Sequence, residues 1–316
     1  MEREQIRISV RNLVEFILRS GDIDNRRASL DTMEAMQAGS RLHRKIQKKM
    51  GSTYHAEVPL NIIIEEENYE LGIWGRADGI IIEETVTIDE IKGVYLSLDL
   101  LEEPVKVHLA QAKCYAYIYG IQNDLQKINV QMTYGNLDTG DLKYFSYEYS
   151  MQQLQEWFSD LILKYKKWAD FQYEWRKKRQ ASIKELAFPF PYREGQKELA
   201  AGVYRTIARK KNLFIQAPTG VGKTISTLYP AIKAVGEGLG DKIFYLTAKT
   251  VTANVAKETL GILCEKGYRA KSVQITAKEK LCPCEEVDCN PVSCPYAKGH
   301  FDRVNDAVYD LLQKEN

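Results

Sequence analysis

The stretch NLFIQAPTGVGKTISTLYPAIK, residues 212–233, contains the pattern that decides the fold of the C-terminal part of the chain. An apolar run is followed by a loop of small residues, and a segment with helical periodicity begins at Lys223. In such a loop the backbone N–H groups close around phosphate oxygens, and the N-terminus of the helix adds its dipole. The stretch therefore predicts a strand, a phosphate-binding loop and a helix, in that order.

Two side chains of this loop carry most of its expected chemistry. Lys223 would supply a cation to the β- and γ-phosphates of ATP, and the hydroxyl of Thr224 would bind Mg²⁺. A chance glycine-rich turn is the alternative, and it accounts less well for the strand before the loop and the helix after it. The expected nucleotide-binding residues of the loop are Ala217, Pro218, Thr219, Gly220, Val221, Gly222, Lys223 and Thr224.

The segment AFPFPYREGQ, residues 187–196, separates this pattern from the rest of the chain. Pro189 and Pro191 interrupt any helix, so we expect one domain over residues 1–186 and another over residues 187–316. In the second domain a helix, a strand at 212–217, a helix, a strand at 242–250 and a further helix follow one another. That order is typical of a parallel α/β sheet.

Four cysteines lie close together in LCPCEEVDCNPVSCPYAKG, residues 281–299. Their spacing is C-x-C-x4-C-x4-C, whereas zinc fingers usually pair cysteines as C-x2-C twice. The compact run fits an iron–sulfur cluster with four thiolate ligands better, and zinc or no metal remain the alternatives. Cys264 lies in a helix-like segment and Cys114 in another domain, so both are left out. The expected ligands are Cys282, Cys284, Cys289 and Cys294.

These features together resemble the XPD/DinG group of iron–sulfur DNA helicases. In superfamily 2 helicases a segment like that of Arg193 and Gln196 reads adenine, and a segment like IFYLTAKT holds a DNA backbone. The resemblance implies ATP, Mg²⁺ and a [4Fe–4S] cluster at residues 278–299 as cofactors, and DNA as the partner. No Asp-Glu-x-His motif follows Thr224. We therefore expect the chain to bind ATP and DNA without hydrolysing ATP or unwinding DNA.

The N-terminal half has a second set of spaced polar residues. Helices are expected near residues 11–19, 30–50, 105–120 and 151–184, and β-rich runs near 57–64, 69–82, 85–93 and 128–150. Glu90 and Lys92 are two residues apart and so lie on one face of a strand. Asp89, between them, should face the other way. The chemistry-bearing residues are His43, Asp78, Glu90, Lys92, Gln111 and Tyr115.

This set suits metal-assisted cleavage of a phosphodiester. Asp78 and Glu90, with His43, would hold Mg²⁺ or Mn²⁺. Lys92 would orient the attacking water or, as the better suited role, neutralise charge on the phosphate. Gln111 and Tyr115 would position the lysine or the DNA.

Over residues 30–120 the pattern resembles the PD-(D/E)XK nucleases, in particular their RecB-like branch. The resemblance implies an α+β nuclease core in front of the partial RecA-like helicase domain, with an overall α/β fold class. It also implies a role in DNA repair or recombination, on single-stranded DNA or single-stranded ends. One rival hypothesis is a helicase whose nuclease-like domain is inactive and only binds DNA. Another is a phosphate-loop regulatory protein with a zinc knuckle.

Composition limits the remaining classes. The chain has 316 residues, 44% hydrophobic and 28% charged, and a net charge of +1. Attraction to nucleic acid must therefore come from local patches. No apolar run approaches the roughly 20 residues of a membrane helix, and the N-terminus lacks the apolar core of a signal peptide. We expect a cytoplasmic protein that does not contact a membrane.

Overall fold

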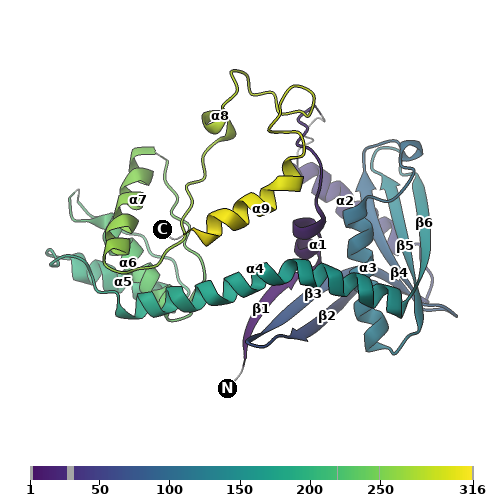
Figure 1. Cartoon of the computed structure of the whole chain (residues 1–316), viewed down its shortest axis with the longest axis horizontal. Helices are drawn as coiled ribbons and strands as arrows, with labels where there is room; N and C mark the ends of the chain where they lie inside the picture. Colours follow the sequence, from purple (N-terminus) through teal and green to yellow (C-terminus); the bar gives the residue numbers. More distant parts are fainter. Residues whose placement is uncertain (1–2, 27–31, 219, 249, 315–316) are drawn as a thin grey trace. The chain divides into compact units, whose positions relative to one another are not determined.

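The computed structural model describes residues 3–26, 32–218, 220–248 and 250–314, which form two compact units (Figure 1). Unit 1 comprises Met1–Asp170 with Pro283–Asp310, and unit 2 comprises Phe171–Cys282 with Leu311–Asn316. The domain boundary expected near residue 187 stays a prediction. Thr219 of the phosphate loop lies outside the described residues.

Unit 1 is built on a mixed sheet of six strands. The strand order is β1-β3-β4-β5-β6, and β2 also pairs with β3. The pairs β1–β3 and β4–β5 are parallel, and the other three pairs are antiparallel. The parallel strand β1 is absent from the elements that the sequence predicts. The strands are β1 (Glu4–Ser9), β2 (Tyr54–Glu65), β3 (Tyr69–Ile81), β4 (Thr87–Val94), β5 (Lys127–Asn136) and β6 (Leu142–Ser150).

Two strands share one edge of β3, and this leaves a notch between them. β2 pairs with β3 along nearly its whole length. On the other edge, β1 pairs with residues 69–74 and β4 pairs with residues 79–81. Among the described residues, 75–77 therefore have β2 as their only strand partner, and Asp78 is paired in none of the three registers. The backbone groups on the open side of this notch must find other partners.

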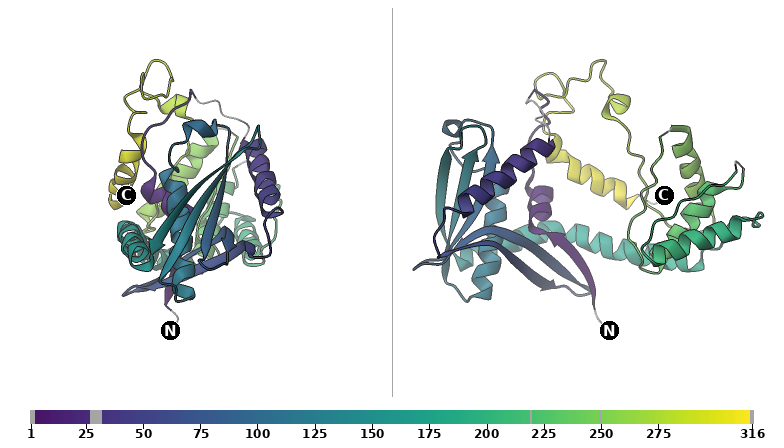
Figure 2. Two further views of the ribbon diagram at one scale, coloured as in Figure 1. Left: turned by 90° about the vertical axis from the view of Figure 1, so that its right-hand side faces the viewer. Right: turned by 180° about the vertical axis from the view of Figure 1, so that it is seen from behind.

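Helices cover both faces of the sheet (Figure 2). On one face, α2 (Thr32–Gln47) packs Leu42 and Ile46 against Ile91 of β4. On the opposite face, α3 (Lys106–Gln122) packs against β4 and β5. The two helices thus approach the notch from opposite sides of the sheet. Unit 1 also includes α1 (Val10–Leu18), the turn η1 (Leu98–Leu100), and most of α9 (His300–Gln313).

The regular secondary structure of unit 2 is helical among the described residues. Its core joins the end of α4 (Met151–Glu185), through Ile183, to Ile232 of α6 (Lys223–Gly236) and Leu263 of α7 (Thr250–Glu265). Lys233 Nζ donates a hydrogen bond of 2.8 Å to the carbonyl oxygen of Ile183, which also accepts one of 3.1 Å from the N–H of Leu186 just beyond the helix. The remaining helices of the unit are α5 (Gln196–Ala208) and α8 (Lys278–Leu281).

The two strands predicted beside the phosphate loop are not formed, and this part of the sequence interpretation is wrong for the described residues. Residues 212–218 and 242–248 have no strand assignment. Phe214 is 96% exposed and Leu246 is 89% exposed. A parallel strand needs a neighbouring strand for its hydrogen bonds, and no described residue of unit 2 supplies one. The apolar pattern is present, but the sheet that would bury it is not formed.

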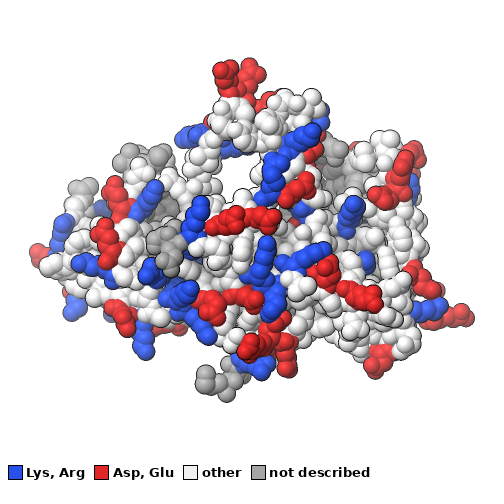
Figure 3. All heavy atoms as spheres, in the orientation of Figure 1, with Lys and Arg blue, Asp and Glu red and all other residues white. Residues whose placement is uncertain are grey.

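Two surface properties bear on the expected partners. No helix among the described residues has both the length and the apolar character needed to cross a bilayer. On the face shown in Figure 3, Lys and Arg side chains are interspersed with Asp and Glu. No single basic field covers that face, in keeping with the net charge of +1.

Candidate functional site

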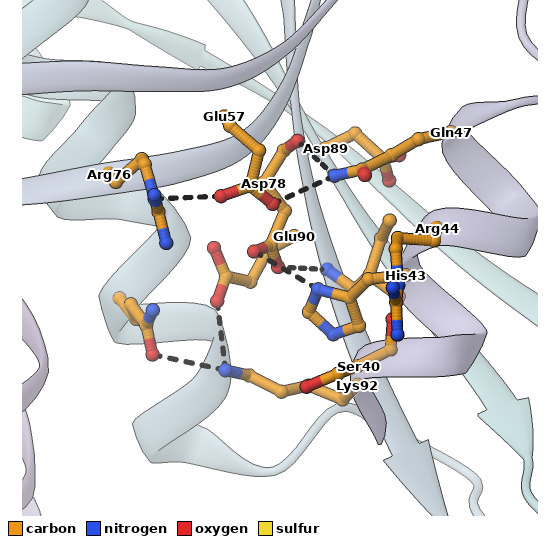
Figure 4. Close-up of polar contacts among 12 residues, drawn as sticks. Ser40, His43, Arg44, Gln47, Glu57, Arg76, Asp78, Asp89, Glu90 and Lys92 are labelled. Atoms are coloured by element: carbon orange, nitrogen blue, oxygen red, sulfur yellow. Dashed lines mark hydrogen bonds and ion pairs between the residues drawn. The ribbon is translucent and has the colours of Figure 1, made fainter. Parts of the chain in front are cut away.

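The six polar residues singled out in the N-terminal half come together at the notch in β3. Figure 4 shows His43, Asp78, Glu90 and Lys92 there, and hydrogen bonds join Gln111 and Tyr115 to them and to β3. His43 comes from α2, Asp78 from β3, and Glu90 and Lys92 from β4. Gln111 and Tyr115 come from α3. The sheet therefore joins side chains that lie up to 72 residues apart, and both covering helices contribute.

Asp78 occupies the open edge of β3 and takes over hydrogen bonds that a neighbouring strand would have made. Its Oδ2 accepts a hydrogen bond of 2.8 Å from the backbone N–H of Ile91. Its Oδ1 lies 3.3 Å from Nδ1 of His43. Burial lowers the pKa of His43, but the hydrogen bond and the charge of Asp78 outweigh burial and raise it overall.

Glu90 and Lys92 lie on the same face of β4, as their spacing predicts. Lys92 Nζ lies 2.8 Å from Oε1 of Glu90. It also donates a hydrogen bond of 3.1 Å to Oε1 of Gln111. Gln111 Nε2 is 3.5 Å from the hydroxyl of Tyr115. A chain of contacts therefore runs from the β4 carboxylate through the lysine to α3 and fixes the position of the ammonium.

The Glu90 carboxylate is completely buried, yet Oε2 has no hydrogen-bond partner among the described residues. The pKa of Glu90 is raised to about 8: burial raises it most, the charge of Lys92 lowers it, and the charge of Asp78 raises it. Burying a carboxylate without donors is unfavourable unless a cation compensates it. This position therefore fits a carboxylate that binds a cation.

Tyr115 closes the open edge of the notch from the α3 side. Its hydroxyl accepts a hydrogen bond of 3.3 Å from the backbone N–H of Arg76. Gly75 makes room for the ring, because a Cβ at this position would lie 2.6 Å from the Tyr115 hydroxyl oxygen. His108, one turn before Gln111, has a different role: its Nδ1 lies 3.0 Å from the hydroxyl of Tyr134. Burial, with the nearby charge of Lys92, lowers the pKa of His108 to about 4.

Asp89 points away from this group. Its carboxylate accepts hydrogen bonds from Thr133 (2.5 Å), Gln131 (3.2 Å) and Tyr54 (3.1 Å). Burial raises its pKa, and the three hydrogen bonds oppose that shift. Asp89 is therefore a buried structural carboxylate with its own donors, unlike its neighbour Glu90.

The sequence interpretation missed Glu57 of β2. One ligand atom each from His43, Glu57 and Asp78 lies within 4.8 Å of the others. Among the described residues this is the one such group of three or more His, Cys, Asp or Glu side chains. The signal that reveals Glu57 is the hairpin register, since Ala56 pairs with Gly79 and Val58 with Ala77, which places Glu57 opposite Asp78.

The donors at the notch fit a hard divalent cation such as Mg²⁺ or Mn²⁺. Carboxylate oxygens are the ligands that such ions prefer, and imidazole suits Mn²⁺. Of the three ligands that the sequence predicts, His43 and Asp78 meet the 4.8 Å separation together with Glu57, whereas no such group includes Glu90 among the described residues. Glu90 has a buried Oε2 without a hydrogen-bond partner, and a cation would compensate it. Lys92 is positioned beside that ion rather than as one of its ligands.

The predicted phosphate loop of unit 2 leads directly into α6. Gly220 and Gly222 have φ of +85° and +73°, values that glycine adopts without strain. The helix α6 begins at Lys223. Lys223 Nζ donates hydrogen bonds of 2.8 Å to the carbonyl oxygens of Ala217 and Pro218. If a nucleotide binds as predicted, its phosphate oxygens would replace these two acceptors. Val221 lies between the two glycines, and Thr224 is the second residue of α6. The carbonyl of Thr224 accepts a hydrogen bond from the hydroxyl of Thr227.

Arg193 and Gln196 both contact the phosphate loop. A guanidinium nitrogen of Arg193 donates to the carbonyl of Gly220. Gln196 is 4% exposed. Its side chain accepts a hydrogen bond of 3.0 Å from the N–H of Arg193 and donates one of 3.2 Å to the carbonyl of Val221. The Gln196 amide is therefore buried against the loop backbone, and its contact with adenine stays a prediction.

The clustered cysteines divide between the two units. Cys282 is assigned to unit 2, whereas Cys284, Cys289 and Cys294 belong to unit 1. Cys289 and Cys294 are buried, and Cys284 is half-buried. Thiolates around a tetrahedral zinc ion lie about 3.8 Å apart, given bonds of about 2.3 Å. No three thiols of the described residues meet the 4.8 Å separation, so the described conformation holds no preformed zinc site. Thiolate chemistry suits an iron–sulfur cluster, which stays a prediction.

Backbone hydrogen bonds attach the cysteine segment to the chain that follows α1. The N–H of Asn25 donates a hydrogen bond of 2.9 Å to the carbonyl of Cys289, and the N–H of Ile23 donates one of 3.0 Å to the carbonyl of Ala297. Phe301 N–H donates 2.9 Å to the carbonyl of Gly21. All these residues belong to unit 1. The segment is therefore paired with the N-terminal part of the sheet-containing unit.

Comparison with known proteins gives a partial result. No protein-family model matches the chain. A probable ATP-dependent helicase of Methanocaldococcus jannaschii is 51% identical over 51 residues, which is 16% of this chain and 8% of the relative's length. This likeness supports a relation to ATP-dependent helicases. The crystal structure of a protein called SSO0001 aligns with 52% of this chain and 78% of its own, at 20% identity and a TM-score of 0.33.

Proposed function

We propose that the chain joins a metal-dependent DNA nuclease of the PD-(D/E)XK type, residues 1–186, to the ATP-binding part of an iron–sulfur DNA helicase, residues 187–316. One observation carries the nuclease proposal. Glu90 is fully buried beside Asp78, and its Oε2 has no hydrogen-bond partner among the described residues. A divalent cation at this carboxylate would relieve its burial, and cations beside an ordered lysine suit phosphodiester cleavage.

Each residue of the site has a task in this proposal. His43, Asp78 and Glu90 hold the cation, which when bound stabilises negative charge on the phosphate and acidifies water. Lys92, fixed by Glu90 and Gln111, places its ammonium where the phosphate gains charge. Tyr115 secures the backbone of β3 behind Asp78.

The helicase part of the proposal is supported by the loop and by the helicase relative. Gly220 and Gly222 have the positive φ that a phosphate-binding turn of backbone N–H groups can use, and Lys223 follows them at the start of α6. ATP with Mg²⁺ is the expected ligand. The proposed substrate is DNA with single-stranded character, and the proposed [4Fe–4S] ligands are the four clustered cysteines. We place the protein in the cytoplasm, in DNA repair or recombination.

Cleavage of end-labelled DNA tests the nuclease. The purified chain is incubated with single- or double-stranded DNA and Mn²⁺, Mg²⁺ or EDTA, beside Lys92→Ala. Lys127→Ala is the matched control, because Lys127 pairs with Glu148 on exposed strand ends. We expect metal-dependent cutting that Lys92→Ala abolishes and Lys127→Ala retains. DNA binding without any cutting would instead support the rival in which this unit is an inactive DNA-binding arm.

A further inference from the structure

Trp74 of β3 differs from the other tryptophans of the chain because it is exposed and has no ring partner. It is 54% exposed, and among the described residues no aromatic ring or cationic side chain contacts it. The other three tryptophans each contact an aromatic ring or an ammonium group: Trp157 with Lys113, Trp168 with Phe16, and Trp175 with Phe171. A single exposed apolar residue is ordinary on a protein surface, so the surroundings of Trp74 decide what it can do.

Trp74 and Arg76 point to the face of the sheet opposite α3. Gly75 between them is directed at α3, because a Cβ on Gly75 would lie 2.6 Å from the hydroxyl oxygen of Tyr115. Side chains alternate along a strand, so both neighbours of Gly75 face the other way. That side is open here: the side chain of Arg76 is 66% exposed, and Asn61, which pairs with Trp74 across the hairpin, is exposed too.

An arginine of the neighbouring strand β1 lies on the same face. Arg7 is exposed and pairs with Gly72, two residues before Trp74. A Cβ on Gly72 would lie 3.6 Å from Cγ of Arg7, so the Arg7 side chain extends over this glycine on the side of the sheet that Trp74 faces. Arg7 donates a hydrogen bond to the neutral side chain of Gln5 and forms no ion pair among the described residues. Glu70, which accepts a hydrogen bond from Gln5, lies toward the start of β3, away from the notch.

Arg76 lies between Trp74 and the notch. Its Nε is 2.7 Å from Oε2 of Glu57, and Figure 4 shows this pair beside Asp78. A guanidinium group has five N–H donors, so an exposed one that pairs with a carboxylate can still donate to a phosphate. Four residues of strand separate Trp74 from Asp78, which is about 13 Å at about 3.3 Å per residue. A nucleic-acid strand held at Trp74 therefore passes Arg76 before it reaches the notch.

We propose that Trp74 is a stacking platform for an unpaired base of single-stranded DNA, and that Arg7 and Arg76 bind the phosphates on either side of that base. The inference rests on the proposed nuclease function and goes beyond it by naming the residues that select a single strand. An aromatic side chain stacks on the face of any unpaired base, whereas inside a duplex the neighbouring base pairs cover both faces. The two guanidinium groups supply the charge that the backbone of the strand attracts.

Fluorescence anisotropy of a labelled oligo(dT) of about 20 nucleotides, titrated with the full chain in EDTA, tests the platform. EDTA prevents metal-dependent cutting, so binding is measured alone. Trp74→Ala should weaken binding of the single strand about fivefold or more, and binding of a blunt duplex of the same length about twofold or less. Trp74→Leu, which keeps apolar bulk without an aromatic face, should lose as much as Trp74→Ala. Trp74→Tyr should restore most of the affinity, because its ring can stack.

Two further variants make the measurement specific. Tyr144→Ala is the matched control, since Tyr144 is 53% exposed on β6 of the same sheet, and it should bind the oligonucleotide as the wild type does. Arg7→Ala should reduce the slope of log K against log salt by about 0.7, the value for one phosphate contact on a single strand. An unchanged slope would remove Arg7 from the proposed contacts.

The outcomes separate this inference from the function on which it rests. Loss of single-strand affinity in Trp74→Ala and Trp74→Leu that Trp74→Tyr restores supports the platform, whether or not the wild type cuts DNA with Mn²⁺. Wild-type chain that does not bind the oligonucleotide overturns the platform. Unchanged affinity in Trp74→Leu, or an equal loss on single strand and duplex, also overturns it. Binding that depends on Trp74, without cutting in Mn²⁺ or Mg²⁺, overturns the nuclease proposal alone.

Discussion

The backbone N–H of Ile91 donates a 2.8 Å hydrogen bond to Oδ2 of Asp78, just where the pairing between β3 and β4 ends. A side chain thus replaces a backbone acceptor at the open edge of the sheet. Asp78 therefore has two separable roles. It completes the backbone hydrogen bonding of β4, and it offers negative charge to a cation.

Two variants of Asp78 should separate these roles. Asp78→Asn keeps an oxygen that accepts from Ile91, so it should lose Mn²⁺ binding with little loss of stability. Asp78→Ala leaves the buried Ile91 amide without an acceptor and should also lower the free energy of unfolding by about 1–3 kcal/mol. Urea unfolding and Mn²⁺ titration measure the two effects. Equal stability of the two variants would show that the hydrogen bond contributes nothing.

Glu90 should make the stability of the metal-free chain depend on pH. Its pKa is 4.5 as an ordinary glutamate and about 8 in the folded protein. Between these values the folded chain keeps a proton that the unfolded chain has released, so the free energy of unfolding falls as pH rises from about 4.5 to 8. Glu90→Gln, which cannot ionise, should lose this part of the pH dependence.

Thermal unfolding in EDTA at pH 6 and pH 8.5 measures this effect. The melting temperature of the wild type should fall over this interval more steeply than that of Glu90→Gln. Saturating Mn²⁺ should restore the wild type at pH 8.5, because the ion binds the ionised carboxylate. Parallel pH curves for the two proteins in EDTA would mean that Glu90 is not the group responsible.

Gly75 should be required for the position of Tyr115. In Gly75→Ala the new Cβ would lie 2.6 Å from the Tyr115 hydroxyl oxygen, so the ring must move and release the N–H of Arg76. We expect cleavage to fall by about 100-fold, since small displacements of catalytic groups have effects of that size. Gly39→Ala is the control, because a Cβ there has no atom within 4 Å. It should leave cleavage unchanged and stabilise α2 by about 0.5–1 kcal/mol.

The sequence predicts the parts of this site that depend on local spacing. Glu90 and Lys92 share a face because side chains alternate along a strand, and the same rule turns Asp89 to its separate network. The place of Glu57 at the site could not be predicted from spacing along one strand, because it depends on the register between β2 and β3 and on a positive φ. The notch itself depends on β1, whose parallel pairing with β3 joins residues more than 60 positions apart.

At 212–217 and 242–250 the sequence predicts strands that are not formed among the described residues. Their apolar residues predict strands, but a strand forms only when a neighbour supplies hydrogen bonds and a surface to bury it. Phe214 and Leu246 lie exposed in segments without regular secondary structure instead. In the loop before α6, Gly220 and Gly222 nevertheless have positive φ, because a glycine turn depends on local conformation.

Lys223 should affect nucleotide binding without affecting cleavage. Its ammonium contacts the carbonyls of Ala217 and Pro218, which marks the position where phosphate oxygens would bind. Lys223→Ala should weaken ATP binding by about tenfold or more, or about 1.4 kcal/mol. Isothermal titration with ATP and Mg²⁺ measures the loss, and DNA cleavage by the same variant should equal that of the wild type. Unchanged ATP affinity would remove Lys223 from the proposed site.

Iron–sulfur loading should tighten the contact between the cysteine segment and residues 21–25. The carbonyls of Cys289 and Ala297 accept hydrogen bonds from the N–H groups of Asn25 and Ile23, so a cluster that fixes Cys289 should slow hydrogen exchange at these two amides. Anaerobic reconstitution, with analysis of iron and acid-labile sulfide, would accompany the exchange measurement. Cys289→Ser should lose iron and leave the amides exchanging as in the unloaded chain.

Cys264 provides the matched control for this experiment. It packs against the helical core of unit 2, and burial raises the pKa of its thiol, which is unfavourable for a metal-binding thiolate. Cys264→Ser should therefore keep the wild-type iron content. Iron lost in Cys264→Ser but kept in Cys289→Ser would reassign the ligands. Stoichiometric zinc without sulfide in the wild type would replace the cluster by a zinc site, and the thiols of Cys284, Cys289 and Cys294 would then have to move together to bind it.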